Sequence, residues 1–162
     1  MKYLLDSNVF IQAKNDYYSF DIAPGFWRWL ELLGEEQSAL TVKAVREEII
    51  EGDDALRDWM VDLPKEYFIE PDIPVQENVR KIVTAVMQEP AYPEHNRYSF
   101  LEKADPWLIA TAMTGAYTVV THEEKTGPGA KKVKIPNICE IFQVPYLTVF
   151  ELMKMNKVQL RL

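Results

Sequence analysis

Short apolar segments alternate with longer amphipathic segments along this chain, and this alternation constrains its fold more than any other feature. Five segments have the length and apolar character of strands, and they lie at residues 2–5, 39–42, 67–69, 117–121 and 144–149. Helical segments separate most of them, and a helical crossover is the usual way to connect parallel neighbouring strands. The sequence therefore predicts an α/β fold in which helices cover both faces of a central parallel sheet.

Apolar residues at helical spacing identify the helices. They are predicted from about Val9, from Pro24 onward, over 42–52, 55–63, 75–88 and 107–115, and from Asn137. The remaining stretches contain glycine, proline and polar residues. We expect residues 89–104 to be an irregular insertion and residues 122–136 to be a polar loop.

The composition is that of one globular domain, which we expect to span residues 1–162. Hydrophobic residues make up 48% of the chain and charged residues 27%, and no run approaches the roughly 18 apolar residues of a membrane span. The apolar N-terminal run is broken by Asp6 and has no small-residue cleavage site, so a signal peptide is not expected. Cys139 is the single cysteine and forms no internal disulfide, which favours a cytoplasmic location.

Four acidic residues occupy positions that this architecture would bring together. Asp6 directly follows the first strand, Glu48 lies in the helix after the second, Asp105 opens the helix before strand 117–121, and Glu123 lies just beyond that strand. Ligands of open parallel sheets bind at the carboxyl ends of the strands. We therefore expect these four carboxylates to form one site.

Each acid also has a simpler interpretation. Asp6 and Asp105 could be helix N-caps, since Asp105 precedes a proline at the first helical position. Glu48 could be a solvated helix charge and Glu123 an ordinary loop residue. Asp6 is the most informative of the four, because a carboxylate buried at the end of an apolar strand costs several kcal/mol unless it is paired or bound to a metal.

Helical geometry separates Glu48 from its neighbour Glu47. At 100° per residue, Glu48 falls between Ala44 and Val45 on the helical wheel, whereas Glu47 points away from the apolar face. Glu48 therefore borders the packed face and is the better candidate for reaching an inner site.

A divalent cation would relieve the repulsion between clustered carboxylates. Oxygen ligands suit Mg²⁺ or Mn²⁺ better than Zn²⁺. A zinc pattern is missing from the sequence, since His95, His122 and Cys139 are isolated from one another. The sequence therefore predicts a magnesium or manganese site.

Four sequence blocks together resemble the PIN-domain family of ribonucleases, most closely its VapC-type toxins. The blocks are YLLDSNVFI, VREEIIEG, KADPWLIATA and TVVTHEE, and they cover nearly the whole chain. The resemblance implies a three-layer α/β/α sandwich and Mg²⁺- or Mn²⁺-dependent cleavage of RNA. It also implies an antitoxin protein as partner and a homodimer.

The resemblance assigns roles by position. Asp6, Glu48 and Asp105 match the metal-binding and catalytic acids, and Glu123 matches a fourth acid that is usually aspartate. The extra methylene of Glu123 puts direct metal binding by this residue in question. Polar positions that orient the acids are matched by Ser7, Asn8 and Thr121.

The net charge of −7 argues against a nucleic-acid-binding protein, because phosphate is bound by lysine and arginine. Residues 125–134 are an exception, since they contain no acidic residue but include Lys125, Lys131, Lys132 and Lys134. We expect this loop to contact the RNA backbone near the metal, although a solvated loop is an equally good interpretation.

Three other functions remain open from the sequence. A PIN-like module without catalysis is favoured by Glu123 in place of aspartate. A metal-dependent deoxyribonuclease is compatible with every residue named above. A phosphoacceptor domain fits less well, because Asp6 is followed by Ser7 and Asn8 and not by a second acid. The tryptophans could stack on bases, although core packing is the usual role of this residue.

Overall fold

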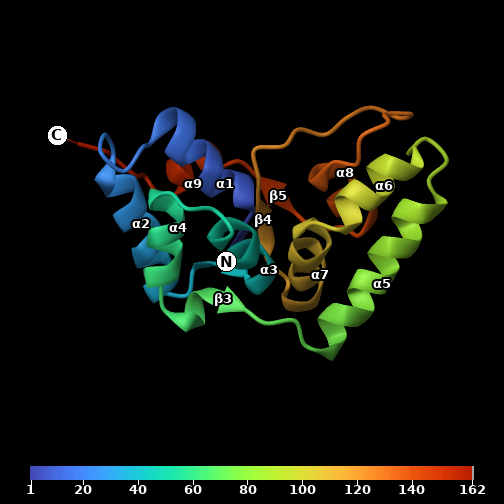
Figure 1. Cartoon of the computed structure of the whole chain (residues 1–162), viewed down its shortest axis with the longest axis horizontal. Helices are drawn as coiled ribbons and strands as arrows, with labels where there is room; N and C mark the ends of the chain where they lie inside the picture. Colours follow the sequence, from blue (N-terminus) through green and yellow to red (C-terminus); the bar gives the residue numbers. More distant parts are fainter. Residues whose placement is uncertain (162) are drawn as a thin grey trace.

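A parallel sheet of five strands forms the centre of the computed structural model, which describes residues 1–161 (Figure 1). The strand order is β3-β2-β1-β4-β5, and every neighbouring pair is parallel. The strands are β1 (Tyr3–Leu5), β2 (Ala39–Val42), β3 (Phe68–Ile69), β4 (Thr118–Val120) and β5 (Tyr146–Leu147). The parallel sheet predicted from the alternating segments is therefore confirmed.

Helices cover both faces of this sheet. Figure 1 shows α1, α2, α4 and α9 on one side and α5, α6, α7 and α8 on the other, and α7 packs on β2 and β4. The helices are α1 (Ser7–Gln12), α2 (Pro24–Glu35), α3 (Lys43–Ile50), α4 (Ala55–Asp62), α5 (Ile73–Gln88), α6 (Glu94–Leu101), α7 (Asp105–Gly115), α8 (Ile135–Ile141) and α9 (Val149–Met155). This is the predicted three-layer α/β/α sandwich, and Leu162, the last residue of the predicted domain, lies outside the described residues.

The three central strands, β1, β2 and β4, are buried on both faces, as a parallel sheet between two helical layers requires, whereas the edge strands β3 and β5 are half-buried. Leu4, Leu5, Val119 and Val120 have no exposed surface. None of the helices within residues 1–161 is both long and apolar enough to cross a bilayer.

The order in which strands are added to the sheet reverses at β1, while all strands stay parallel. From the central β1 the chain builds outward through β2 and β3, and it then returns to the other side of β1 to form β4 and β5. Loops that leave β1 and β4 at their carboxyl ends must diverge, which opens a crevice at that edge. The residues that follow β1 and β4, Asp6 and Thr121, lie in this crevice.

Several elements differ from their prediction. Residues 89–104 are not irregular throughout, because α6 begins directly after Pro93, whose extended backbone suits an N-cap position. The last predicted strand is reduced to Tyr146–Leu147, and Thr148 then caps α9 through its side chain. Helix α8 begins at Ile135 and not at Asn137, since Pro136 is well accommodated in a first helical turn.

Candidate active site

Asp6 is buried at the end of β1, with 1% of its surface exposed. It occupies the N-cap position of α1, yet its side chain makes no capping hydrogen bond. Instead Thr121 Oγ1 donates to Asp6 Oδ2 at 3.0 Å, and Ser7 Oγ lies 3.4 Å from Oδ1. The carboxylate therefore faces the crevice between β1 and β4 and does not serve the helix.

Glu48 is exposed on α3, but its carboxylate reaches the start of α7, as its position on the helical wheel allows. Its Oε1 accepts a hydrogen bond of 2.6 Å from the Ala104 backbone N–H, and its Oε2 lies 3.4 Å from Ser7 Oγ. Its neighbour Glu47 lies instead beside Lys43, at 4.0 Å. Glu48 thus connects the start of α1 to the start of α7.

Asp105 is the first residue of α7 and not its N-cap, which corrects the capping interpretation. The N-cap is Ala104, whose carbonyl accepts from the Leu108 N–H. The Asp105 carboxylate is therefore not committed to the helix. Burial raises its pKa to about 8, and the negative charges of Asp6, Glu123 and Glu48 add to this effect.

The charges of Asp6, Glu48 and Glu123 all act on Asp105, so the structure brings the four predicted acids into one electrostatic cluster. We call Asp6, Glu48, Asp105 and Glu123 the acid cluster. The pKa of Asp6 is also raised, to about 7, mainly by burial and further by Glu123, while the hydrogen bond from Thr121 acts in the opposite direction. At neutral pH these carboxylates cannot all be ionised without a compensating positive charge.

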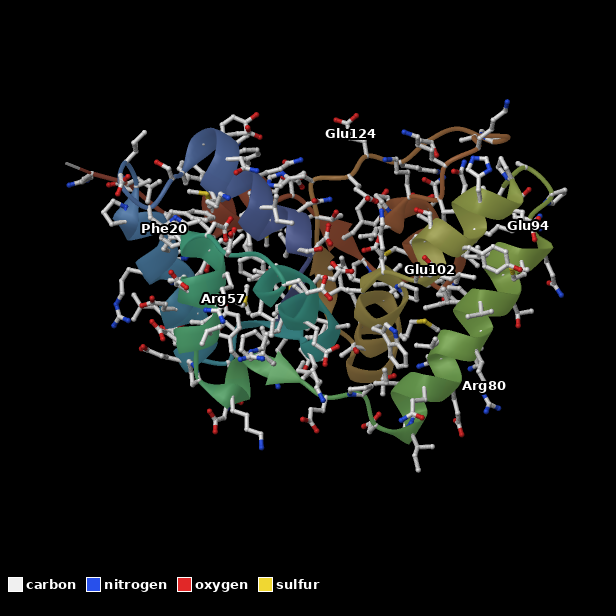
Figure 2. The ribbon with its side chains drawn as sticks, in the orientation of Figure 1. Phe20, Arg57, Arg80, Glu94, Glu102 and Glu124 are labelled. Carbon is white, nitrogen blue, oxygen red and sulfur yellow. The ribbon has the colours of Figure 1, made fainter. Side chains whose placement is uncertain are left out.

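Glu123 is held at the edge of the cluster by its own hydrogen bonds. Its Oε2 accepts from the backbone N–H of Ile135 at 2.7 Å, which caps the start of α8. Its own N–H donates to Thr121 Oγ1 at 3.1 Å. The next residue, Glu124, is exposed and points away from the protein (Figure 2), so the loop contributes a single acid to the cluster.

The donor set of the acid cluster fits a divalent cation that prefers oxygen ligands. It offers carboxylates, with raised pKa values for two of them, and two hydroxyl groups that orient Asp6. Within residues 1–161, no three acidic, histidine or cysteine side chains are already close enough to hold a metal ion. To hold a cation, these side chains would have to lie closer together than they do here.

Two residues that lie next to site residues in the sequence form no side-chain hydrogen bond with the acids of the described chain. Asn8 is half-buried, and within the described part of the chain its side chain forms no hydrogen bond. His122 packs its ring against Phe150 at 5.4 Å, and burial lowers its pKa. Its place between Thr121 and Glu123 in the sequence therefore does not bring it into the cluster.

A groove of about 250 Å³ adjoins the acid cluster and is lined by Asp105, Glu123 and three lysines. We call Lys103, Lys132 and Lys134 the lysine groove. Lys103 was missed in the sequence, although its position two residues before Asp105 is the signal that could have identified it.

The other two lysines predicted to bind RNA do not line this groove. Lys125 forms an ion pair with Glu140 at 2.6 Å. Lys131 is exposed, and its carbonyl accepts a hydrogen bond from Asn96. Only part of the predicted cationic loop therefore faces the acids.

Comparisons with known proteins agree with this architecture. The model of a family described as a domain of unknown function, DUF4411, matches residues 3–160. A search of curated proteins found no match. A chain in the crystal structure of VapBC2 from Rickettsia felis, bound to a DNA fragment from their promoter, is 15% identical, with 91% of this chain and 98% of that chain covered and a TM-score of 0.57. At this identity the likeness shows the fold alone, and it confirms the predicted VapC-like PIN fold.

Proposed function

This chain belongs to the DUF4411 family, and we propose that it is a metal-dependent endoribonuclease. The observation that carries the proposal is the convergence of four acids on the crevice between β1 and β4, where burial and mutual repulsion hold the pKa values of Asp6 and Asp105 near neutrality. Such a cluster is costly for a fold unless it serves chemistry.

In this proposal the acid cluster holds Mg²⁺ or Mn²⁺, with Asp6 and Asp105 as the principal ligands. A cation held by these residues would supply Lewis-acid activation of the scissile phosphodiester and would lower the pKa of bound water. Ser7 and Thr121 fix the orientation of the Asp6 carboxylate by donating to its two oxygens. Glu48 fixes the start of α7, and with it Asp105, through the Ala104 N–H.

The lysine groove would bind the phosphate backbone beside the cluster. Its three ammonium groups border the same cavity as Asp105 and Glu123, so a phosphate bound there would adjoin the reacting centre. This local positive charge answers the objection raised by the net charge of −7.

The choice of RNA over DNA, and the biological role, rest on the resemblance to VapC toxins. The chain would be the toxin of a toxin–antitoxin pair, act as a homodimer in the cytoplasm, and be inhibited by an antitoxin that covers the acid cluster. The fold shared with a chain of the VapBC2 structure supports this role. Co-expression with a small protein encoded next to it should then suppress RNA cleavage.

The test of the nuclease is RNA cleavage by the purified protein in Mg²⁺, in Mn²⁺ and in EDTA, with DNA of the same sequence as a second substrate. We expect cleavage of RNA only with a cation. Loss of a residue that only orients a metal ligand can lower activity by roughly 100-fold. Asp6→Asn and Asp105→Asn, which alter the ligands themselves, should each lower the cleavage rate by at least this much. Asp53→Asn, at an exposed acid, is the matched control.

A binding module without catalysis is the second candidate, and Glu123 favours it. Its carboxylate already accepts a hydrogen bond from the Ile135 N–H. Among the described residues, the acids do not lie close enough together to hold a cation. Binding of RNA without cleavage under any metal condition would establish this alternative. Normal cleavage by both aspartate variants would refute the catalytic assignment.

A further inference from the structure

A second cavity lies beside the acid cluster, on the side of α7 that faces the carboxyl ends of β2 and β3. It has a volume of about 260 Å³, and its walls include Val42, Ile69, Pro71 and Trp107. Val42 and Ile69 are the last residues of β2 and β3, and Trp107 lies in the first turn of α7, two residues after Asp105. The cavity is therefore mostly apolar and opens at the edge of the sheet that carries the acids.

Trp107 differs from the tryptophans that build the core. The indole N–H groups of Trp27 and Trp59 donate hydrogen bonds, and both rings pack against other aromatic rings. Trp107 is half-buried, and within residues 1–161 it has neither a hydrogen-bond partner for its indole nor an aromatic neighbour. Trp107 packs in part against the core, and the rest of its side chain lines the cavity.

Cationic side chains border this cavity on its outer side. Lys43 lines it together with an adjoining cavity of about 310 Å³, which Arg46, Lys65 and Phe68 also line. The Arg46 guanidinium lies 5.4 Å from the centre of the Phe68 ring. In the part of the chain that the structure describes, neither Arg46 nor Lys65 forms an ion pair. Two acids lie among these three cations, since Glu47 lies beside Lys43 and Glu70 lines the adjoining cavity, so the lining carries a small excess of positive charge.

We propose that the cavity at Trp107, which we call the base pocket, binds an unpaired nucleobase of the RNA substrate. The inference rests on the proposed function and adds to it a site for one base. Unpaired bases are bound by stacking on aromatic side chains, with cationic groups along the adjoining backbone, and the base pocket offers both. A base held in a duplex could not enter it.

Polar groups in the base pocket would face the edge of the base. Glu47 and Thr111 line it beside Lys43. The Thr111 hydroxyl already donates to the Trp107 carbonyl at 2.7 Å, so its oxygen remains an acceptor. A carboxylate and a hydroxyl oxygen would accept hydrogen bonds from the amino group of a base. Glu47, which makes no contact with the acids, thereby acquires a role of its own.

The base pocket and the lysine groove flank the first turn of α7 on opposite sides, because residues i and i+2 do not face the same side of a helix. Asp105 lines the lysine groove and Trp107 lines the base pocket, and in Figure 1 α7 lies between α3 and α6. A strand whose phosphates follow the lysine groove would therefore cross the acid cluster before placing a base against Trp107. The base next to the cleaved bond would then be read by the protein.

The test measures binding of a fluorescently labelled single-stranded RNA by anisotropy, in EDTA to prevent cleavage. Trp107→Leu keeps an apolar side chain but removes the aromatic surface, and it should weaken binding roughly 5- to 100-fold. Trp107→Phe should retain most of the affinity. Trp29→Leu is the matched control, because Trp29 is also half-buried but lies on α2, away from the acids, and it should bind as the wild type does. Duplex RNA should bind with an affinity that Trp107→Leu leaves unchanged.

The same measurements separate failure of the base pocket from failure of the nuclease. If the wild type cleaves RNA and folded Trp107→Leu binds the single strand as tightly as the wild type, the base pocket is refuted and the nuclease stands. An equal loss in Trp29→Leu, or in duplex binding, would also refute it. If the wild type neither binds nor cleaves RNA, both proposals fail.

Discussion

Replacing Asp6 with asparagine should stabilise the cation-free protein at pH 8 while removing its nuclease activity. Asp6 is 1% exposed, and burial is the main reason that its pKa rises from 3.8 to about 7. The folded state holds the Asp6 proton more tightly than the unfolded state. The contribution of Asp6 to the free energy of unfolding is therefore greatest below about pH 4 and is lost as the pH rises to about 7. The ionised carboxylate therefore opposes folding at pH 8.

The magnitude follows from the same pKa values. Each pKa unit corresponds to about 1.4 kcal/mol, so the rise from 3.8 to about 7 means that ionised Asp6 costs about 4 kcal/mol at pH 8. At pH 4 Asp6 is protonated in most of the folded protein, so it lowers the free energy of unfolding by only about 0.5 kcal/mol. Asparagine keeps an oxygen that accepts from Thr121 but adds an amide NH₂ that needs a partner. We therefore expect a gain of about 2–4 kcal/mol at pH 8 and less than about 1 kcal/mol at pH 4.

The assay is urea unfolding of wild type, Asp6→Asn and the exposed control Asp53→Asn in EDTA, at both pH values. Added Mg²⁺ should stabilise the wild type at pH 8, since binding to the folded state adds to its stability, and should stabilise Asp6→Asn much less. Equal stability of wild type and Asp6→Asn at pH 8 would refute the claim that Asp6 carries a buried, unfavourable charge. Equal stabilisation of both by Mg²⁺ would refute its role as a ligand.

Three further predictions test other parts of the structure. Thr121→Val removes the donor to Asp6 Oδ2, so it should destabilise the cation-free protein by about 1–3 kcal/mol, more at pH 8 than at pH 4; a loss that does not depend on pH would contradict this. Gly34→Ala would place a Cβ 2.3 Å from the Tyr67 ring and should cost about 1–3 kcal/mol by urea unfolding, whereas Gly127→Ala meets nothing within 4 Å and should be nearly neutral. Alanine at all three positions of the lysine groove should weaken RNA binding. It should also lower the slope of log affinity against log salt concentration by about 2, since each phosphate contact with a single strand contributes roughly 0.7. An unchanged slope would exclude these lysines from contact with the RNA backbone.

The sheet and the meeting of the acids were predictable because both depend on local sequence patterns. An apolar run that ends in an acid, as at Asp6, specifies a buried strand and places the carboxylate at its carboxyl end. The helical wheel was sufficient to choose Glu48 over Glu47, since the two side chains leave the helix about 100° apart and only Glu48 reaches the start of α7. Their part in metal binding and catalysis stays a prediction.

Features that depend on distant contacts were not predictable in the same way. Proline can end one helix or precede the next, so Pro93 could be read as a break although it precedes α6. The partner of Glu123, the Ile135 N–H, lies 12 residues further on, and no local pattern links the two. Lys103 joined the lysine groove only when the fold brought α6 beside the loop after β4.

The bond between Glu123 and Ile135 has a consequence for the loop that it closes. The carboxylate of Glu123 ties the start of this loop to its end, across 12 residues. Just beyond the loop, Asn137 of α8 holds Thr126 through side-chain and backbone hydrogen bonds. Closing a loop at its base removes conformational entropy from the chain when the protein folds. Less entropy then remains to be lost when Lys132 and Lys134 engage a ligand, which is the advantage of preorganisation. The longer side chain at position 123 thus gives the loop a fixed frame.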